Sequence, residues 1–309
     1  SLGSEWLVGT NDTTAFFTGL SFDAIMLNYA TDMVSISAIA SKLAEGFDDF
    51  GDSDADLYAV YGSYLGLEDV VLDLYWMMVR DDVSLLGESV DLHTIGLRGA
   101  GALGAFDFDA EVAYQLGEIE YRDFLWWDND VDYGAWGVNL EAGYTFDMGW
   151  QPRVYAGFAF LEGAGDDDDG WFEEEEPAFN RLFSNWEYSE FLDNTDLSNS
   201  FVYRLGLSVM PTECLSLALA GTYIMADQVW EWDGLIFDWE ADDQEGLELG
   251  LYGDYAYSED LTFRAGYAHF FTDDGAEDGN MILANGLLPY VEDEDDDYDY
   301  VFVETELSF

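Results

Sequence analysis

The feature that most constrains the fold is a period-two alternation of apolar and polar residues, which recurs in runs of about 9 to 13 residues. It is clearest between Leu247 and Tyr257, where leucines and tyrosines occupy most odd positions and Glu248 and Asp254 lie among the even ones. Because successive side chains of a strand point to opposite faces, such a run has one apolar and one polar face. The chain is therefore expected to form long, two-sided strands.

Pattern counting predicts thirteen such strands, separated by segments rich in Gly, Asp and Asn. They cover 20–30, 33–43, 55–66, 69–80, 90–102, 106–116, 136–146, 152–162, 198–210, 214–226, 247–257, 260–271 and 300–309. Brief turns alternate with long, mostly acidic connections, of which 163–197 is the longest. This alternation is typical of an antiparallel barrel in the bacterial outer membrane, with tight periplasmic turns and long external loops.

Aromatic residues and the chain end favour a membrane barrel over a soluble all-β domain. Aromatic side chains cluster where strands approach their ends, as an interfacial girdle requires, although ordinary core packing would also explain them. These residues are Tyr29, Tyr75, Trp76, Tyr144, Trp150, Tyr223, Tyr255, Tyr257, Tyr267, Phe270 and Phe271. The final run Tyr300–Phe309 alternates and ends in an aromatic residue, which resembles the assembly signal of bacterial outer-membrane barrels. No stretch reaches the roughly 18 apolar residues that a membrane helix needs.

Charge and composition exclude several classes of function. The 309 residues include 67 acidic and 8 basic side chains, giving a formal charge of −59, so nucleic-acid binding is excluded. A hydrophobic content of 49% indicates a folded chain despite that charge. Cys214 is the single cysteine, and the two histidines, His93 and His269, stand alone in alternating strands without a nucleophile or phosphate-loop motif. We therefore expect no enzyme and no cofactor.

The polar strand faces supply the candidate pore-lining residues. The carboxylates are Asp73, Asp107, Asp109, Glu111, Glu141, Glu248, Asp254, Glu304 and Glu306, and the arginines are Arg98, Arg153, Arg204 and Arg264. The arginines fit two interpretations, a basic ladder within an acidic lumen or pairing of each arginine with neighbouring carboxylates. The acidic surplus favours pairing.

Short motifs resemble a known family. Leu92–Gly99 runs into Ala110–Gly117, Phe179–Phe183 lies in the longest connection, and Ser21–Ile25 is a weaker match. Together they resemble the bacterial outer-membrane porins of the alginate-export type. The resemblance implies a closed antiparallel barrel of about 18 strands that passes an anionic polysaccharide or a small hydrophilic solute. On that basis residues 1–309 are one barrel domain that lacks about five N-terminal strands.

The longest connection, 163–197, carries apolar side chains that a solvated acidic loop would lack. They are Phe172, Phe179, Leu182, Phe183 and Trp186. A connection of this length is usually functional or disordered. These apolar anchors predict an ordered segment that packs inward and constricts the pore.

These features predict an outer-membrane channel for passive diffusion of ions or small hydrophilic solutes, with a preference for cations and with membrane lipid around it. The alternative is a structural or adhesive barrel whose acidic loops bind cations. Acidic runs occur at 166–169, 173–176, 273–280 and 292–297, and their oxygen ligands suit Ca²⁺. None has the spacing of a known calcium loop, and solvated loops, or an adaptation to a saline habitat, explain them equally well.

Overall fold

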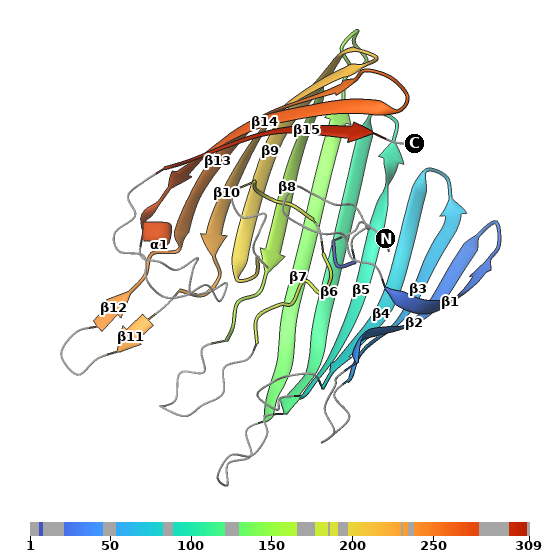
Figure 1. Cartoon of the computed structure of the whole chain (residues 1–309), viewed down its shortest axis with the longest axis vertical. Helices are drawn as coiled ribbons and strands as arrows, with labels where there is room; N and C mark the ends of the chain where they lie inside the picture. The colour runs from blue at the N-terminus through green and yellow to red at the C-terminus, as the bar shows by residue number, and fades with distance from the viewer. Residues whose placement is uncertain are drawn as a thin grey trace.

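A single antiparallel sheet of thirteen strands dominates the computed structural model (Figure 1). The structure describes residues 6–8, 22–45, 54–82, 89–120, 130–165, 177–184, 186–190, 197–229, 231–233, 238–277 and 297–307. The sheet strands are β1 (Asp23–Ala30), β2 (Val34–Glu45), β3 (Asp54–Leu67), β4 (Val70–Asp81), β5 (Ser89–Leu103), β6 (Phe106–Glu120), β7 (Asp130–Thr145), β8 (Arg153–Leu161), β9 (Ser200–Thr212), β10 (Leu215–Ala226), β13 (Gln244–Ala256), β14 (Leu261–Thr272) and β15 (Tyr298–Leu307). The all-β, antiparallel prediction is confirmed.

Each strand pairs with its neighbours in sequence, so the sheet is a continuous meander. Short turns join alternate pairs, as predicted. At the β5–β6 turn Gly104 has a φ of 69°, in the left-handed region that glycine adopts without strain. Between β10 and β13, which pair with each other, the chain forms a separate hairpin. Its strands are β11 (Glu231–Asp233) and β12 (Asp238–Glu240).

Two connections differ from the sequence-based expectation. The sequence predicts a connection between the strands 106–116 and 136–146, but β6 and β7 continue into it, and their ladder runs on to the pair Glu120 and Asp130. It also predicts a connection between 214–226 and 247–257, which contains the β11–β12 hairpin, in which Trp232 pairs with Trp239. Three-residue strands are too short to produce a period-two signal.

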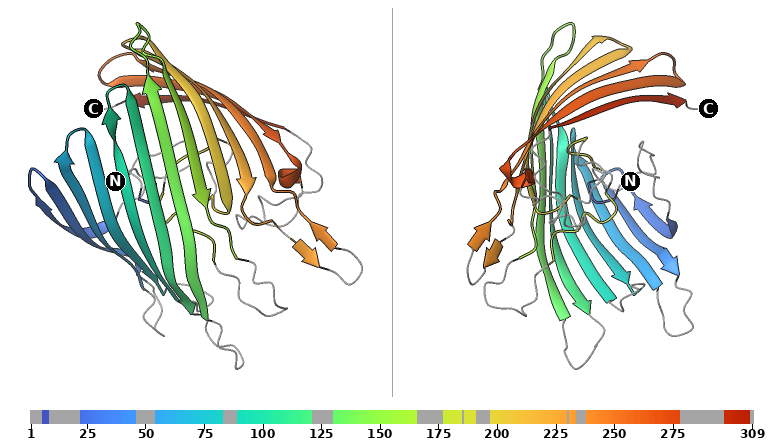
Figure 2. Two further views of the ribbon diagram at one scale, coloured as in Figure 1. Left: turned by 180° about the vertical axis from the view of Figure 1, so that it is seen from behind. Right: turned by 60° about the vertical axis from the view of Figure 1, so that its left-hand side comes forward.

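The sheet is strongly curved, and its two edges are β1 and β15 (Figures 1 and 2). No ladder joins β1 to β15 within the described residues. All eight residues of β1 are exposed, because nothing described covers either of its faces. The expectation of further strands ahead of β1 stays a prediction. The C-terminal Phe309 lies outside the described residues.

The alternation read from the sequence separates two faces of the sheet. On β13, Leu247 is 36% exposed and Leu249 is 43% exposed, whereas Glu248 between them is 3% exposed. Large apolar side chains are exposed in the same way on β4, β5, β9 and β10. An exposed apolar surface of this extent is suited to contact with lipid.

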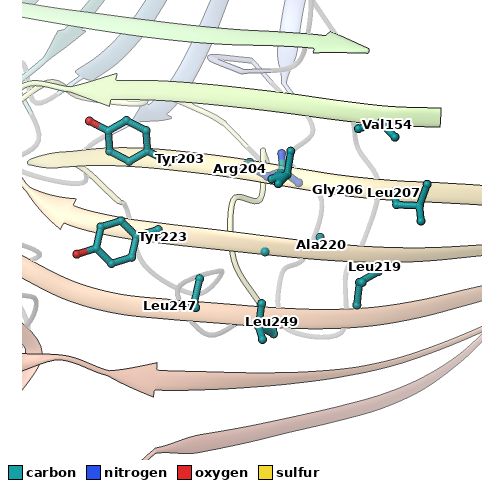
Figure 3. Close-up of a pocket in the computed structure, with 12 residues that line it drawn as sticks. Val154, Tyr203, Arg204, Gly206, Leu207, Leu219, Ala220, Tyr223, Leu247 and Leu249 are labelled. Atoms are coloured by element: carbon teal, nitrogen blue, oxygen red, sulfur yellow. The ribbon is translucent and has the colours of Figure 1, made fainter. Parts of the chain in front are cut away.

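A shallow groove of about 620 Å³ lies on this apolar outer face, across β8, β9, β10 and β13 (Figure 3). It forms where Gly221 of β10 lies between Leu205 and Leu249, its partners on the two adjacent strands. Tyr203 and Tyr223 lie side by side at one end of the groove. Their position near the ends of β9 and β10 matches the interfacial placement of tyrosine in membrane barrels.

We expect Leu249→Arg to destabilise the protein in a bilayer by about 2–4 kcal/mol, because the charge would face hydrocarbon near the middle of β13. The free energy of unfolding would be measured by urea titration in lipid vesicles. Leu249→Met is the control, since it keeps the volume and polarity and should cost less than about 1.5 kcal/mol. Equal stability of both variants would contradict a lipid-facing β13.

Candidate functional site

A segment of the β8–β9 connection covers the polar face of the sheet. This inner segment comprises residues 177–184 and 186–190, and the face that it covers is called the inner face (Figure 2). Phe179 is 1% exposed and packs directly on β7, where a Cβ at Gly137 would lie 2.3 Å from Cζ of the ring. The predicted inward packing of 163–197 is therefore confirmed for its described part. Phe172 lies outside the described residues.

Hydrogen bonds fix the inner segment to strands that lie far apart in the sheet. On β6, Gln115 exchanges two hydrogen bonds of 2.7 Å with the backbone of Asn180. On β10, Thr222 donates to the carbonyl of Tyr188 at 3.1 Å. On β13, Glu248 accepts from the Ser189 hydroxyl at 2.6 Å and from the Glu190 backbone at 3.1 Å. The segment therefore crosses the inner face from β6 to β13.

Residues from the start of the chain complete this packing. Trp6 is fully buried, stacks on Phe179 with ring centroids 5.6 Å apart, and donates from Nε1 to the Tyr188 hydroxyl at 2.7 Å. Tyr188 in turn donates to Asn139 of β7 at 3.2 Å. Arg181 of the family-like motif donates to Ser184 within the segment. These contacts hold the inner segment against the inner face.

The inner face carries the predicted carboxylates and arginines, and it brings them together as ion pairs. Arg98 of β5 lies 3.0 Å from Asp73 and 2.5 Å from Asp109, on the two adjacent strands. Arg153 of β8 lies 2.5 Å from Asp107 and 2.9 Å from Glu141. The geometry matches the pairing interpretation for both arginines.

The other two inner-face arginines are held less tightly. Arg204 of β9 approaches one carboxylate, Glu141, at 3.9 Å. Arg264 of β14 lies 3.1 to 3.4 Å from carboxylates on both neighbouring strands, namely Asp254, Glu304 and Glu306. Each predicted arginine is therefore within 4 Å of at least one carboxylate.

Three of the predicted pore-lining carboxylates do not face open space. Asp73, Glu111 and Glu248 lie on the inner face but are only 3–4% exposed. Arg98 covers Asp73, the Tyr75 hydroxyl donates to Glu111 at 2.7 Å, and the inner segment covers Glu248. Alternation identified the face on which they lie, but it did not reveal what packs over them.

The structure gives no support to a metal centre in the part of the chain that it describes. Within the described residues, no group of three or more His, Cys, Asp or Glu side chains is placed to hold a metal ion. The acidic runs 166–169, 173–176 and almost all of 292–297 lie outside the described residues. Of the run 273–280, residues 273–277 are described, and they include the short helix α1 (Asp274–Glu277). Calcium binding by these loops stays a prediction.

No helix in the described residues is long and apolar enough to cross a membrane. The family model described as "Alginate export" matches residues 1–280. The chain belongs to the alginate export family. The resemblance noted in the sequence is thus confirmed, and the family places this chain in the bacterial outer membrane. The description of the family, alginate export, is one of transport.

Among solved structures, the chain is similar to the ferric enterobactin receptor PfeA in complex with BCV-L6, with 11% identity and a TM-score of 0.46. The match covers 82% of this chain and 42% of the receptor. A mutant of the receptor from Pseudomonas aeruginosa gives 10% identity, a TM-score of 0.43 and the same coverage. The chain thus spans less than half the length of these receptors. No curated protein matches the chain.

One titratable group lies where the inner segment meets β13. Burial raises the pKa of Glu190 to about 7, and repulsion from Glu187 and Glu248 adds to the shift, whereas a hydrogen bond with Tyr252 opposes it. A raised carboxyl pKa means that the packed state favours the protonated form. Packing of the segment is therefore strongest below the ordinary carboxyl pKa and weakens as the pH rises through about 7.

We expect single-channel conductance to rise between pH 5 and pH 8, as Glu190 ionises beside Glu187 and Glu248 and loosens the inner segment. Glu190→Gln should remove most of this pH dependence, because it keeps the volume but cannot ionise. Glu259→Gln, in the exposed β13–β14 turn, is the control and should leave the dependence intact. A pH profile unchanged by Glu190→Gln would show that another group controls it.

Proposed function

We propose that the protein is a passive outer-membrane channel that favours cations over anions. The observation that carries this proposal is the charge balance of the inner face. Nine predicted carboxylates share that face with four arginines, and each arginine is already paired. The inner face therefore carries more negative than positive charge.

Several surplus carboxylates are accessible to water. Asp254, Glu304 and Glu306 are 49%, 44% and 50% exposed, and they share one partner, Arg264. A passage lined by one sign of charge and walled by low-dielectric protein concentrates the potential on passing ions. Cations would be enriched there and anions depleted.

The same charge balance argues against an anionic polymer as the solute. A pore that selects such a polymer is expected to present unpaired Arg or Lys along its path. Here Arg98 and Arg153 each contact two or more carboxylates at short distances. The solutes that fit this inner face best are small cations and uncharged hydrophilic molecules, and the inner segment limits their size.

Reversal potentials in planar bilayers under a salt gradient should show cation preference at low salt. The preference should shrink towards 1 M salt, where the Debye length falls to about 3 Å. The double variant Glu304→Gln and Glu306→Gln should reduce it, because both carboxylates lie on the inner face of β15. Asp299→Asn removes one carboxylate charge from the other face of that strand and is the control, to be compared per charge removed. Anion preference at low salt would contradict the proposal, and absence of conductance would favour the structural or adhesive alternative.

Phe179→Ala should increase single-channel conductance, because it removes the buried ring that packs against Gly137 of β7. Truncation of a buried phenylalanine costs about 3–5 kcal/mol, which is enough to release a docked segment. Phe146→Ala, at an exposed turn next to β7, is the control and should leave conductance unchanged. Unchanged conductance in Phe179→Ala would mean that the inner segment does not limit the passage.

A further inference from the structure

We propose that the apolar groove on the outer face binds phosphatidylethanolamine, with one acyl chain in the groove and the ammonium headgroup at its tyrosine end. The groove has a volume of about 620 Å³, in the range of small-molecule sites. It is continuous with the exposed apolar surface of the sheet, so a lipid reaches it directly from the bilayer. The inference goes beyond the proposed function, because it concerns the outer face and not the passage.

A missing side chain in the middle of the outer face produces the groove. Paired residues on neighbouring antiparallel strands have their side chains on the same face. Gly221 pairs with Leu205 on one side and with Leu249 on the other, and these leucines are 63% and 43% exposed. They stand above the glycine, so an unbranched hydrocarbon chain that lies over Gly221 contacts a leucine on each side.

The length of the groove fits one leaflet of a bilayer. Along the strands it extends from the pair Tyr203 and Tyr223 to the pair Leu207 and Leu219. The two pairs are four residues apart on each strand, which corresponds to about 13 Å. The hydrocarbon of one leaflet is about 15 Å thick, half of the bilayer core. The groove therefore takes an acyl chain from one leaflet.

The two tyrosines mark the end at which the headgroup lies. Their hydroxyl groups point away from the leucines (Figure 3). The Tyr223 hydroxyl donates to Oε1 of Gln244 at 3.1 Å, just where β13 begins. Tyrosine is enriched at the level of lipid headgroups, because its ring is apolar and its hydroxyl is polar. A chain that enters the groove here leaves its headgroup beside Gln244.

The surroundings of this end are acidic, and this selects the headgroup. The backbone N–H of Gln244 donates to the Asp242 carboxylate at 3.0 Å. The negative charges of Asp242, Asp243 and Asp273 all act on the Tyr223 hydroxyl. An ammonium group complements these charges and donates hydrogen bonds to carboxylates. The headgroup of phosphatidylglycerol is anionic and has no cation to offer, so the same charges repel it.

Native mass spectrometry of the full chain in detergent tests the proposal, with phosphatidylethanolamine and phosphatidylglycerol of identical acyl chains added at equal concentration. We expect the complex with phosphatidylethanolamine to be about fivefold more abundant. Equal or greater binding of phosphatidylglycerol would overturn the proposal. A protein dimer that is lost in Gly221→Leu would also overturn it, because a second copy of the chain would then cover the groove.

Gly221→Leu locates the acyl chain, because the new side chain fills the groove. A Cβ at Gly221 would lie 3.3 Å from Cδ2 of Leu249, the movable end of a side chain. Gly253→Leu is the matched control, since Gly253 lies on the same face outside the groove and its Cβ would lie 3.3 Å from Cδ2 of Leu217. Binding of phosphatidylethanolamine should fall about tenfold in Gly221→Leu and stay unchanged in Gly253→Leu.

Gly221→Ala fills part of the groove and should give an intermediate loss, so the test does not depend on the folding of the leucine variant. Equal binding in the Gly221 variants and in Gly253→Leu would overturn the assignment to this groove.

A pair of double variants tests the headgroup end. Asp242→Asn with Asp243→Asn should remove most of the preference for phosphatidylethanolamine over phosphatidylglycerol, because the acyl groove stays but the charges go. Glu259→Gln with Asp260→Asn removes two carboxylates at the opposite end of β13 and should leave the preference intact. A preference that survives in the first double variant would overturn the role of the acidic end.

Discussion

The structure depends on one constraint, which is that backbone N–H and C=O groups in hydrocarbon must be paired within the protein. The thirteen-stranded sheet satisfies this constraint, because each of its strands between β1 and β15 pairs with a strand on both sides. Once strands are the only spanning element, side chains must alternate between lipid and interior. The outer face is consequently apolar, as Leu249 and Leu251 show, and the chemistry of the chain is concentrated on the inner face.

Polar residues on that inner face are buried because the inner segment satisfies them. Gln115 and Thr222 are 0% and 3% exposed, and both bond to the backbone of the segment. An amide or hydroxyl in such a position would be costly without these bonds. The same contacts orient the segment, so the polar strand face and the inner segment stabilise each other. They also place Trp186 and Glu187 beside Glu141, Arg153 and Arg204 of β7, β8 and β9.

The strands were predictable because alternation is a local property, and strand ends near Ala30, Leu103 and Ala226 follow directly from it. The faces of Arg98 and Glu111 were predictable for the same reason. The acidic surplus also favoured pairing, but the particular partners were not predictable, since they depend on the register that sets Arg98 opposite both Asp73 and Glu111. Contacts such as Trp6 with Tyr188 join residues 182 positions apart and leave no periodic signal. In the sequence, only the apolar residues of the connection 163–197 indicated that the inner segment packs against the sheet.

The arginines also bear on how an acidic chain can fold at all. Asp73 and Asp109 lie on strands that flank β5, and without Arg98 between them their charges would repel across a partly dry interior. Arg264 lies between carboxylates of the two strands next to its own in the same way, and Arg153 of β8 links Asp107 and Glu141 of β6 and β7. The cations of the inner face are thus used in holding strands together, and exposed carboxylates such as Glu304 and Glu306 remain in excess of them. In this family member the same few arginines therefore stabilise the sheet and leave a surplus of negative charge on the inner face.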